Sequence, residues 1–173
     1  MNILQLGNNI LRGTSEKIPE NEIVSAQTRE LIKKMSEALH KEPQGIGLAA
    51  VQIGVPKSVF IVSEYVFNPS SYAGKESEEE IKKRKETEKY AVFINPRIIK
   101  LSKKKALLSE GCLSVAGKFG RVKRSINVTV EAYDENGRMF KRGAGGLLAQ
   151  VLQHEYDHLN GILFVDKVEK IDK

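Results

Sequence analysis

Two histidines and a glutamate near the end of the sequence are the residues best suited to metal chemistry. In the stretch QHEYDHLNG, His154 and His158 stand four positions apart, and Glu155 directly follows the first. Residues at this spacing lie on one face of a helix, so both imidazoles can reach one metal ion, and the glutamate can take a proton from water. The pattern predicts two metal ligands and a general base. An amphipathic helix with two surface histidines is the alternative.

The third ligand of such a site is expected upstream of this motif. Metalloproteases with an HExxH motif take their third ligand from a residue that follows it. Here Asp166, Glu169 and Asp172 are the only histidine, cysteine or acidic residues that follow. The upstream candidates are Cys112, His40 and several carboxylates.

Cys112 is the most suggestive of these candidates because of its neighbours. It lies in EGCLSVAG, between Gly111 and Gly117, where a thiolate can approach a metal without crowding from side chains. A single cysteine is also common as a small apolar core residue. Cys112 by itself leaves both interpretations open.

A glycine-rich segment, GIGLAAVQIG at 45–54, adds a polar group to the candidate site. It has neither the GK[ST] ending of a P-loop nor the GxGxxG spacing of a dinucleotide site. Its small residues allow close approach of the backbone to a ligand, and Gln52 offers an amide donor that can stabilise an oxyanion. A glycine-rich turn with a surface glutamine is the alternative.

The elements that position these residues follow from hydrophobic periodicity. An amphipathic helix is predicted over 25–40, and a second helix over 144–159 carries QHEYDH. Strands are predicted over 59–62, 91–94, 126–133 and 138–142, the last two joined by the turn DENG. The fold class is therefore α+β, with mostly antiparallel sheets around a C-terminal helix that carries HExxH and with an N-terminal amphipathic helix.

Composition limits the class of protein. The 173 residues fit one domain, 1–173, and 40% hydrophobic with 29% charged residues is typical of globular chains. With one cysteine and neither a signal peptide nor a long apolar run, we expect a protein of the reducing cytoplasm that has no membrane partner.

A charged insertion is predicted at about 64–89. Its core, KESEEEIKKRKETEK, mixes acidic and basic side chains, which favours an exposed helix or loop over a dedicated binding element. The net charge of +6 is compatible with a ribosomal or nucleic-acid surface. Because much of the basic charge is mixed with acid, no specific nucleic-acid partner is expected.

The three segments together resemble peptide deformylases. GIGLAAVQIG resembles the first motif of that family, EGCLS the second and QHEYDH the third, in the same order. The similarity runs from about residue 45 to residue 166, through RVKR, INVTV and LNGILFVD. Val51 and Ala116 stand where many members carry proline, and neither change removes a catalytic atom.

The resemblance implies a metal-dependent hydrolase that removes the N-formyl group from the initiator methionine of new polypeptides and releases formate. The metal would be one divalent ion, usually Fe²⁺, for which Ni²⁺, Co²⁺ or Zn²⁺ can substitute. By resemblance, the metal ligands are Cys112, His154 and His158, Glu155 is the general acid and base, and Gln52 with the backbone N–H of Leu113 forms the oxyanion hole.

The resemblance also implies a substrate pocket and supporting groups. The formyl-methionyl peptide would bind along Ile46 and Gly47, with Leu147 and Val151 also lining the methionine pocket. Glu110, Arg124 and Asp157 would orient the ligands, although ordinary ion pairing explains these three charges equally well.

Alternative functions follow from the same residues. An HExxH protease would need a ligand after the motif, and a noncatalytic metal-stabilised module that binds ribosome or nucleic acid would need neither Glu155 nor Gln52. A transient ribosome contact is compatible with the resemblance, but the short tail after Val165 disfavours docking through a long terminal helix.

Overall fold

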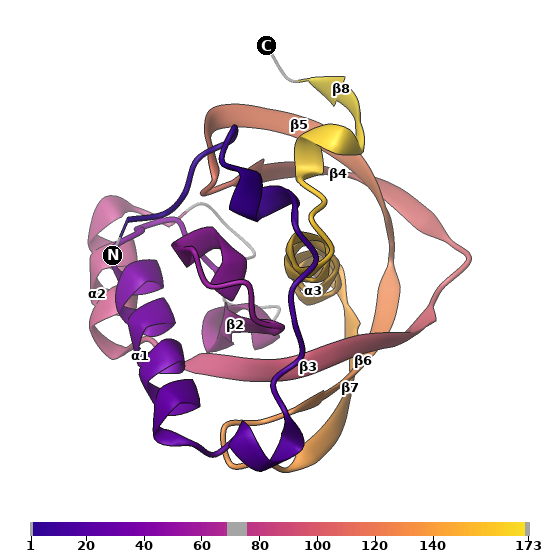
Figure 1. The fold of residues 1–173 in the computed structure, drawn as a ribbon. Coiled ribbons are helices and arrows are strands. Elements are labelled where there is room, and N and C mark those ends of the chain that lie inside the picture. The colour runs from indigo at the N-terminus through magenta and orange to yellow at the C-terminus, as the bar shows by residue number, and fades with distance from the viewer. Residues whose placement is uncertain (1, 69–75, 172–173) are drawn as a thin grey trace.

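The protein folds around one central helix. The structure, a computed structural model, describes residues 2–68 and 76–171. Figure 1 shows α3 (Gly146–Leu159) nearly end-on in the middle of the molecule, with the strands curving around it. Two antiparallel sheets and this late helix confirm the predicted α+β class.

The larger sheet has the strand order β1-β2-β3-β6-β7, so β1 is an edge strand. All of its pairs are antiparallel. The pair of β2 with β3 joins the two strands that flank the insertion. Its strands are β1 (Gly47–Ala49), β2 (Val59–Ser63), β3 (Tyr90–Leu101), β6 (Asn127–Tyr133) and β7 (Met139–Gly145).

The smaller sheet is formed by β4 (Lys105–Cys112), β5 (Val115–Ser125) and β8 (Val168–Ile171), in the order β4-β5-β8. The pairing of β4 with β5 shifts register between Gly111 and Cys112. Such an irregularity changes where the next side chain points. Cys112 thus sits at the point where the strand departs from regular pairing.

Strand β2 is buried on both faces, because helices cover both sides of the larger sheet. Val59 and Ile61 pack in the core beneath α1 (Ala26–His40), whereas Phe60 and Val62 pack in the core with α3. This explains the continuous apolar run VFIV, since a strand covered on both faces needs no polar positions.

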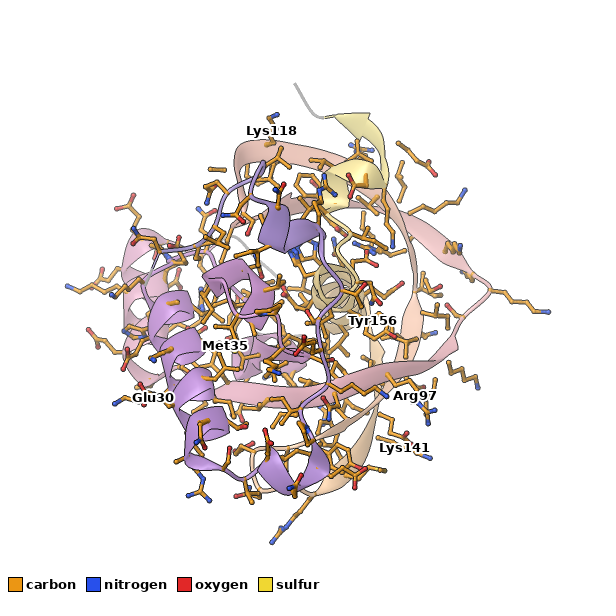
Figure 2. All side chains as sticks on the ribbon, in the orientation of Figure 1. Glu30, Met35, Arg97, Lys118, Lys141 and Tyr156 are labelled. Carbon is orange, nitrogen blue, oxygen red and sulfur yellow. The ribbon has the colours of Figure 1, made fainter. Side chains whose placement is uncertain are left out.

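Helix α1 has one buried face and one exposed face. Ser25 caps its first turn by accepting a hydrogen bond from the N–H of Thr28. Met35 is fully buried, whereas Glu30 forms an exposed ion pair with Lys34 (Figure 2). Helix α1 therefore covers the larger sheet with its apolar stripe.

The charged insertion is only partly as predicted. It contains the 3-10 helix η4 (Glu64–Phe67) and α2 (Glu78–Thr87), while 69–75 lies outside the described residues. Most of α2 is exposed, but Lys85 is only 7% exposed. The predicted exposed helix is therefore present as α2, but α2 also packs against the body through the side chain of Lys85.

None of the described helices is long and apolar enough to cross a membrane. Four short 3-10 helices complete the described structure. These are η1 (Asn9–Arg12), η2 (Glu20–Glu22), η3 (Ala50–Ile53) and η6 (Phe164–Asp166).

Gly161, just after the end of α3, is a position where a side chain should lower stability. Gly161 has φ +71°, and an added Cβ would lie 2.4 Å from the carbonyl oxygen of Arg12. Gly161→Ala should therefore lower the free energy of unfolding in urea through both backbone strain and a clash with the N-terminal segment. Gly117 is the matched control, because its φ is +72° and nothing lies within 4 Å of its added Cβ.

We expect Gly117→Ala to cost about 1 kcal/mol for the left-handed backbone alone, and Gly161→Ala at least about 1 kcal/mol more. Equal losses in the two variants would show that the packing of Gly161 against Arg12 adds nothing.

Candidate metal centre

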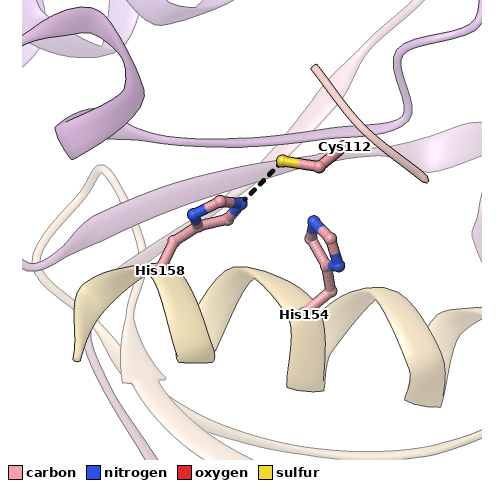
Figure 3. Close-up of side chains that lie close together, drawn as sticks. All are labelled: Cys112, His154 and His158. Atoms are coloured by element: carbon pink, nitrogen blue, oxygen red, sulfur yellow. Dashed lines mark hydrogen bonds between the residues drawn. The ribbon is translucent and has the colours of Figure 1, made fainter. Parts of the chain in front are cut away.

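Cys112, His154 and His158 come together at the face of α3. One ligand atom from each side chain can be chosen so that all lie within 4.8 Å of one another. The Sγ atom of Cys112 lies 3.2 Å from Nε2 of His158, as the dashed line in Figure 3 marks. Both imidazoles rise from one side of the helix, as their spacing predicted, and the thiol faces them from β4 (Figure 3). His40, the other upstream candidate named, is exposed at the end of α1.

The thiol is held in place by two polar groups besides the histidines. The backbone N–H of Ser114 donates to Sγ of Cys112 at 3.4 Å, and Nε2 of Gln52 lies 3.7 Å from the same sulfur. The cysteine is thus a candidate ligand rather than a small apolar core residue.

His154 is oriented by a carboxylate behind it. Its Nδ1 lies 3.0 Å from Oε2 of Glu110, which leaves Nε2 as the atom that can bind a metal. Burial lowers the pKa of His154, but its hydrogen bonds to Cys112 and Glu110 outweigh burial and raise this pKa to about 10. A metal bound here would displace a proton from the ring. Burial lowers the pKa of His158, which keeps that imidazole neutral, as a ligand must be.

Glu110 is in turn paired with Arg124. The guanidinium of Arg124 donates from Nε to Oε1 at 2.7 Å and from NH2 to Oε2 at 2.8 Å. Burial raises the pKa of Glu110, but the hydrogen bonds from Arg124 and His154 prevail and lower it to about 2. Glu110 is therefore an anion at every physiological pH.

Asp157 extends the network to the far side of Arg124. NH1 of Arg124 donates to Oδ2 of Asp157, and Nζ of Lys167 donates to Oδ1 at 2.6 Å. The side chain of Arg124 is 3% exposed, and that of Glu110 is 2% exposed. Arg124, Glu110 and Asp157 therefore form a buried network, and Lys167 joins it from the surface.

Glu155 is the one carboxylate of the site whose charge has little support. The residue is 4% exposed, and its Oε2 has no hydrogen-bond partner among the described residues. A Cβ added to Gly47 would lie 2.5 Å from Oε1, so only glycine allows β1 to approach this carboxylate. Burial raises the pKa of Glu155 to about 7, within the range suited to proton exchange near neutrality.

Gln52 lies in the site and not on the surface. It is 2% exposed, and its Oε1 accepts a hydrogen bond from the N–H of Ala49 at 2.8 Å. Its Nε2 donates to Oγ of Ser114 at 3.1 Å. The fixed carbonyl side of the amide therefore directs the N–H side toward Cys112.

A pocket of about 400 Å³ opens beside the metal centre and is lined by Cys112, His154 and Glu155. The residues predicted to contact substrate also line it, as do Gln52 and Leu113, whereas His158, Arg124 and Asp157 do not. These predicted lining residues are Ile46, Gly47, Leu147 and Val151.

Some lining residues were missed by sequence reasoning. Gln150 lies one helical turn before His154, a spacing that could have identified it, and its Nε2 donates to the carbonyl oxygen of Ser109 at 2.8 Å. Phe119 pairs across the sheet with Gly111, and its ring lies over that glycine. Only the register of β4 with β5 reveals this residue.

Comparisons with known proteins all match peptide deformylases, over nearly the whole chain. A family model described as "Polypeptide deformylase" matches residues 1–173. The chain is 40% identical over 169 residues to "Peptide deformylase 1A, chloroplastic" of Solanum lycopersicum, covering 96% of this chain and 58% of that protein. It is 37% identical over 164 residues to "Peptide deformylase" of Rhizobium meliloti, covering 95% of this chain and 82% of the relative.

A solved structure of similar fold is the Met-Ala-Ser-bound class I type b peptide deformylase from Acinetobacter baumannii. The TM-score is 0.81 at 32% identity, and the match covers 97% of this chain and 98% of that one. A peptide deformylase from Legionella pneumophila matches with a TM-score of 0.77 at 32% identity, over 97% of this chain and 85% of the other. The chain therefore belongs to the polypeptide deformylase family.

Proposed function

We propose that this protein removes the N-formyl group from the N-terminal methionine of newly made polypeptides, with the chemistry done in the pocket beside Cys112, His154 and His158. Its family is one of metal-dependent hydrolases with this activity. The observation that carries the proposal for this chain is that Cys112, His154 and the buried Glu155 line one cavity, with His158 completing the ligand cluster beside Cys112.

The three side chains fit a divalent metal. One thiolate and two imidazoles leave a coordination position open for water or substrate, as in catalytic sites with three protein ligands. When bound, the ion would lower the pKa of water and polarise the formyl carbonyl. We propose Fe²⁺, with Ni²⁺, Co²⁺ or Zn²⁺ as substitutes, because this donor set does not select one divalent ion by type.

Glu155 is proposed as the carrier of the proton. Its carboxylate accepts a proton from the attacking water and returns it to the departing amine nitrogen. The buried position supports this role, because a carboxyl with a pKa of about 7 can both gain and lose a proton near neutrality. Its unpartnered Oε2 is the atom we assign to this transfer.

Gln52 and the backbone N–H of Leu113 are proposed to stabilise the oxyanion that forms when water attacks the formyl carbon. The orientation of Gln52 supports this, because its Oε1 is held by Ala49 and the amide cannot turn without losing that bond. A donor fixed in advance stabilises charge without reorganising during the reaction.

The substrate is proposed to bind along the free edge of β1. An extended peptide can add to an edge strand through main-chain hydrogen bonds, and Gly47 presents this edge next to Glu155. The apolar side chains of Ile46, Leu147 and Val151 would then receive the methionine side chain.

We also propose a single catalytic domain over 1–173, a cytoplasmic location and transient contact with the ribosome. The location and the ribosome contact follow from the nature of the substrate, which appears as the nascent chain leaves the ribosome.

The reaction is tested with formyl-Met-Ala-Ser and iron-loaded protein under anaerobic conditions. We expect stoichiometric formate release and no cleavage of an internally cleavable peptide. Glu155→Ala should keep its metal and lose activity by at least about 100-fold, because the proton carrier is gone. The exposed Glu37→Ala is the control and should retain full activity. Internal cleavage without formate, or normal turnover by Glu155→Ala, would refute the proposal.

Removal of the thiol tests the ligand set. Cys112→Ala should weaken metal affinity by at least about 100-fold, more than the loss of a group that only orients a ligand. Competition with a chelator measures the affinity, and thiol titration reports metal protection directly because Cys112 is the only cysteine in the sequence. Unchanged affinity would exclude Cys112 as a ligand.

Neutralising the carboxylate behind His154 tests how the ligand is oriented. Glu110→Gln should lower metal affinity about 10- to 100-fold, because Nδ1 of His154 loses a charged acceptor. Glu131→Gln is the matched control, since Glu131 pairs with Arg97 and Lys141 and does not line the pocket. Equal affinities in the two variants would show that Glu110 does not support the ligand.

A further inference from the structure

Lys85 is a buried cation in the mostly exposed helix α2. Its Nζ lies 3.0 Å from the carbonyl oxygen of Gly45, 3.3 Å from that of Leu39 and 2.7 Å from Oε2 of Glu88. An ammonium group has three donors, and all three are used. Burying a lysine without such partners would be costly, so this contact is specific rather than incidental.

The two carbonyls belong to the segment that leads into the pocket. Leu39 lies in the last turn of α1, where its carbonyl oxygen also accepts from the N–H of Glu42 at 3.1 Å and where a cation is favourable. Gly45 comes directly before Ile46 and Gly47, which line the pocket. The neighbouring Arg84 donates to the carbonyl oxygen of Pro43 at 3.2 Å. Helix α2 thus holds the connection between α1 and β1 at three points.

Glu88 fixes these two cations to the larger sheet. Its Oε1 accepts from Oγ of Ser63 at 2.5 Å and from NH1 of Arg84 at 2.6 Å. Its Oε2 accepts from the hydroxyl of Tyr90 at 2.7 Å, beside the contact with Lys85. Ser63 ends β2 and Tyr90 begins β3. Glu88 therefore links the cations that hold the connection between α1 and β1 to the larger sheet.

We infer that Lys85 is a positioning residue for substrate binding, which holds residues 41–47 in the conformation that receives the peptide. This inference rests on the proposed function. The charged insertion would then be part of how this chain builds its substrate-binding edge.

The loss of Lys85 is expected to weaken substrate binding and to change the rate of the chemical step little. Residues 41–46 form no helix or strand between α1 and β1, so their order depends on contacts of this kind. Without Lys85, part of the binding energy of the peptide must be used to order the segment. The hydrogen bonds of Lys85 go to Gly45, Leu39 and Glu88 and not to the metal ligands or Gln52. The rate at which the bound substrate reacts should therefore change little.

The test compares wild type, Lys85→Met and Lys82→Met as metal-loaded enzymes acting on formyl-Met-Ala-Ser. We expect the KM of Lys85→Met to rise about 10-fold, the size of a lost hydrogen bond to a charged group, with kcat within about twofold of wild type. Lys82 lies on the exposed side of the same helix, and its variant should match wild type. A purely structural role would reduce the folded fraction, which lowers apparent kcat and leaves KM unchanged.

Hydrogen exchange gives a readout that does not depend on activity. The amides of 45–47 should exchange faster in Lys85→Met than in Lys82→Met, and added Met-Ala-Ser should reduce the difference. If Lys85→Met does not fold, Arg84→Gln tests the same anchor through the Pro43 carbonyl. A KM equal to that of wild type in a folded variant, or the same rise in Lys82→Met, would overturn the inference. Absence of formate release by wild type would refute the proposed function alone, because the exchange difference would remain.

Discussion

The candidate site depends on one buried cation. Arg124 of β5 binds Glu110 of β4 through two hydrogen bonds and Asp157 of α3 through a third. Cys112 lies two residues after Glu110, and Asp157 directly precedes His158, so the same network joins the strand that carries the thiol to the helix that carries the imidazoles. Buried charges lose much of their solvation energy, and such a network serves geometry more than stability. We interpret it as the device that sets the distance between sulfur and the two rings.

Two neighbouring carboxylates of the site, Glu110 and Glu155, have different surroundings and therefore different pKa values. Glu110 is surrounded by cations and donors, which hold its pKa near 2 although burial opposes them. Glu155 is buried with little compensation, and its pKa rises to about 7. One carboxylate therefore keeps a fixed charge that orients His154, while the other can exchange a proton. Gly47 makes this possible by letting β1 exclude solvent from Glu155 without a side chain.

The sequence predicted the helical part of the site because local periodicity fixes it: His154 and His158 share a face in any helix that contains them. Cys112 could not be assigned by spacing, since its distance from the helix depends on the register shift after Gly111. The ordered resemblance of three motifs supplied that link. Phe119 was missed for the same reason, because it is placed by strand pairing.

The charged insertion shows a different limit of sequence reasoning. Its alternating charges indicated a solvated element, and for most of α2 they are solvated. Composition cannot distinguish the one lysine that turns inward, because its partners are backbone carbonyls of residues some 40 positions away. Every residue has a backbone carbonyl, so the residue types do not reveal which carbonyl will accept a hydrogen bond.

We propose that the site holds one metal ion through a sulfur and two imidazole nitrogens. X-ray absorption at the metal edge of the zinc-loaded protein measures this shell directly. We expect one sulfur at about 2.3 Å and two nitrogens at about 2.0–2.1 Å. A shell that contains nitrogen and oxygen but no sulfur would contradict it.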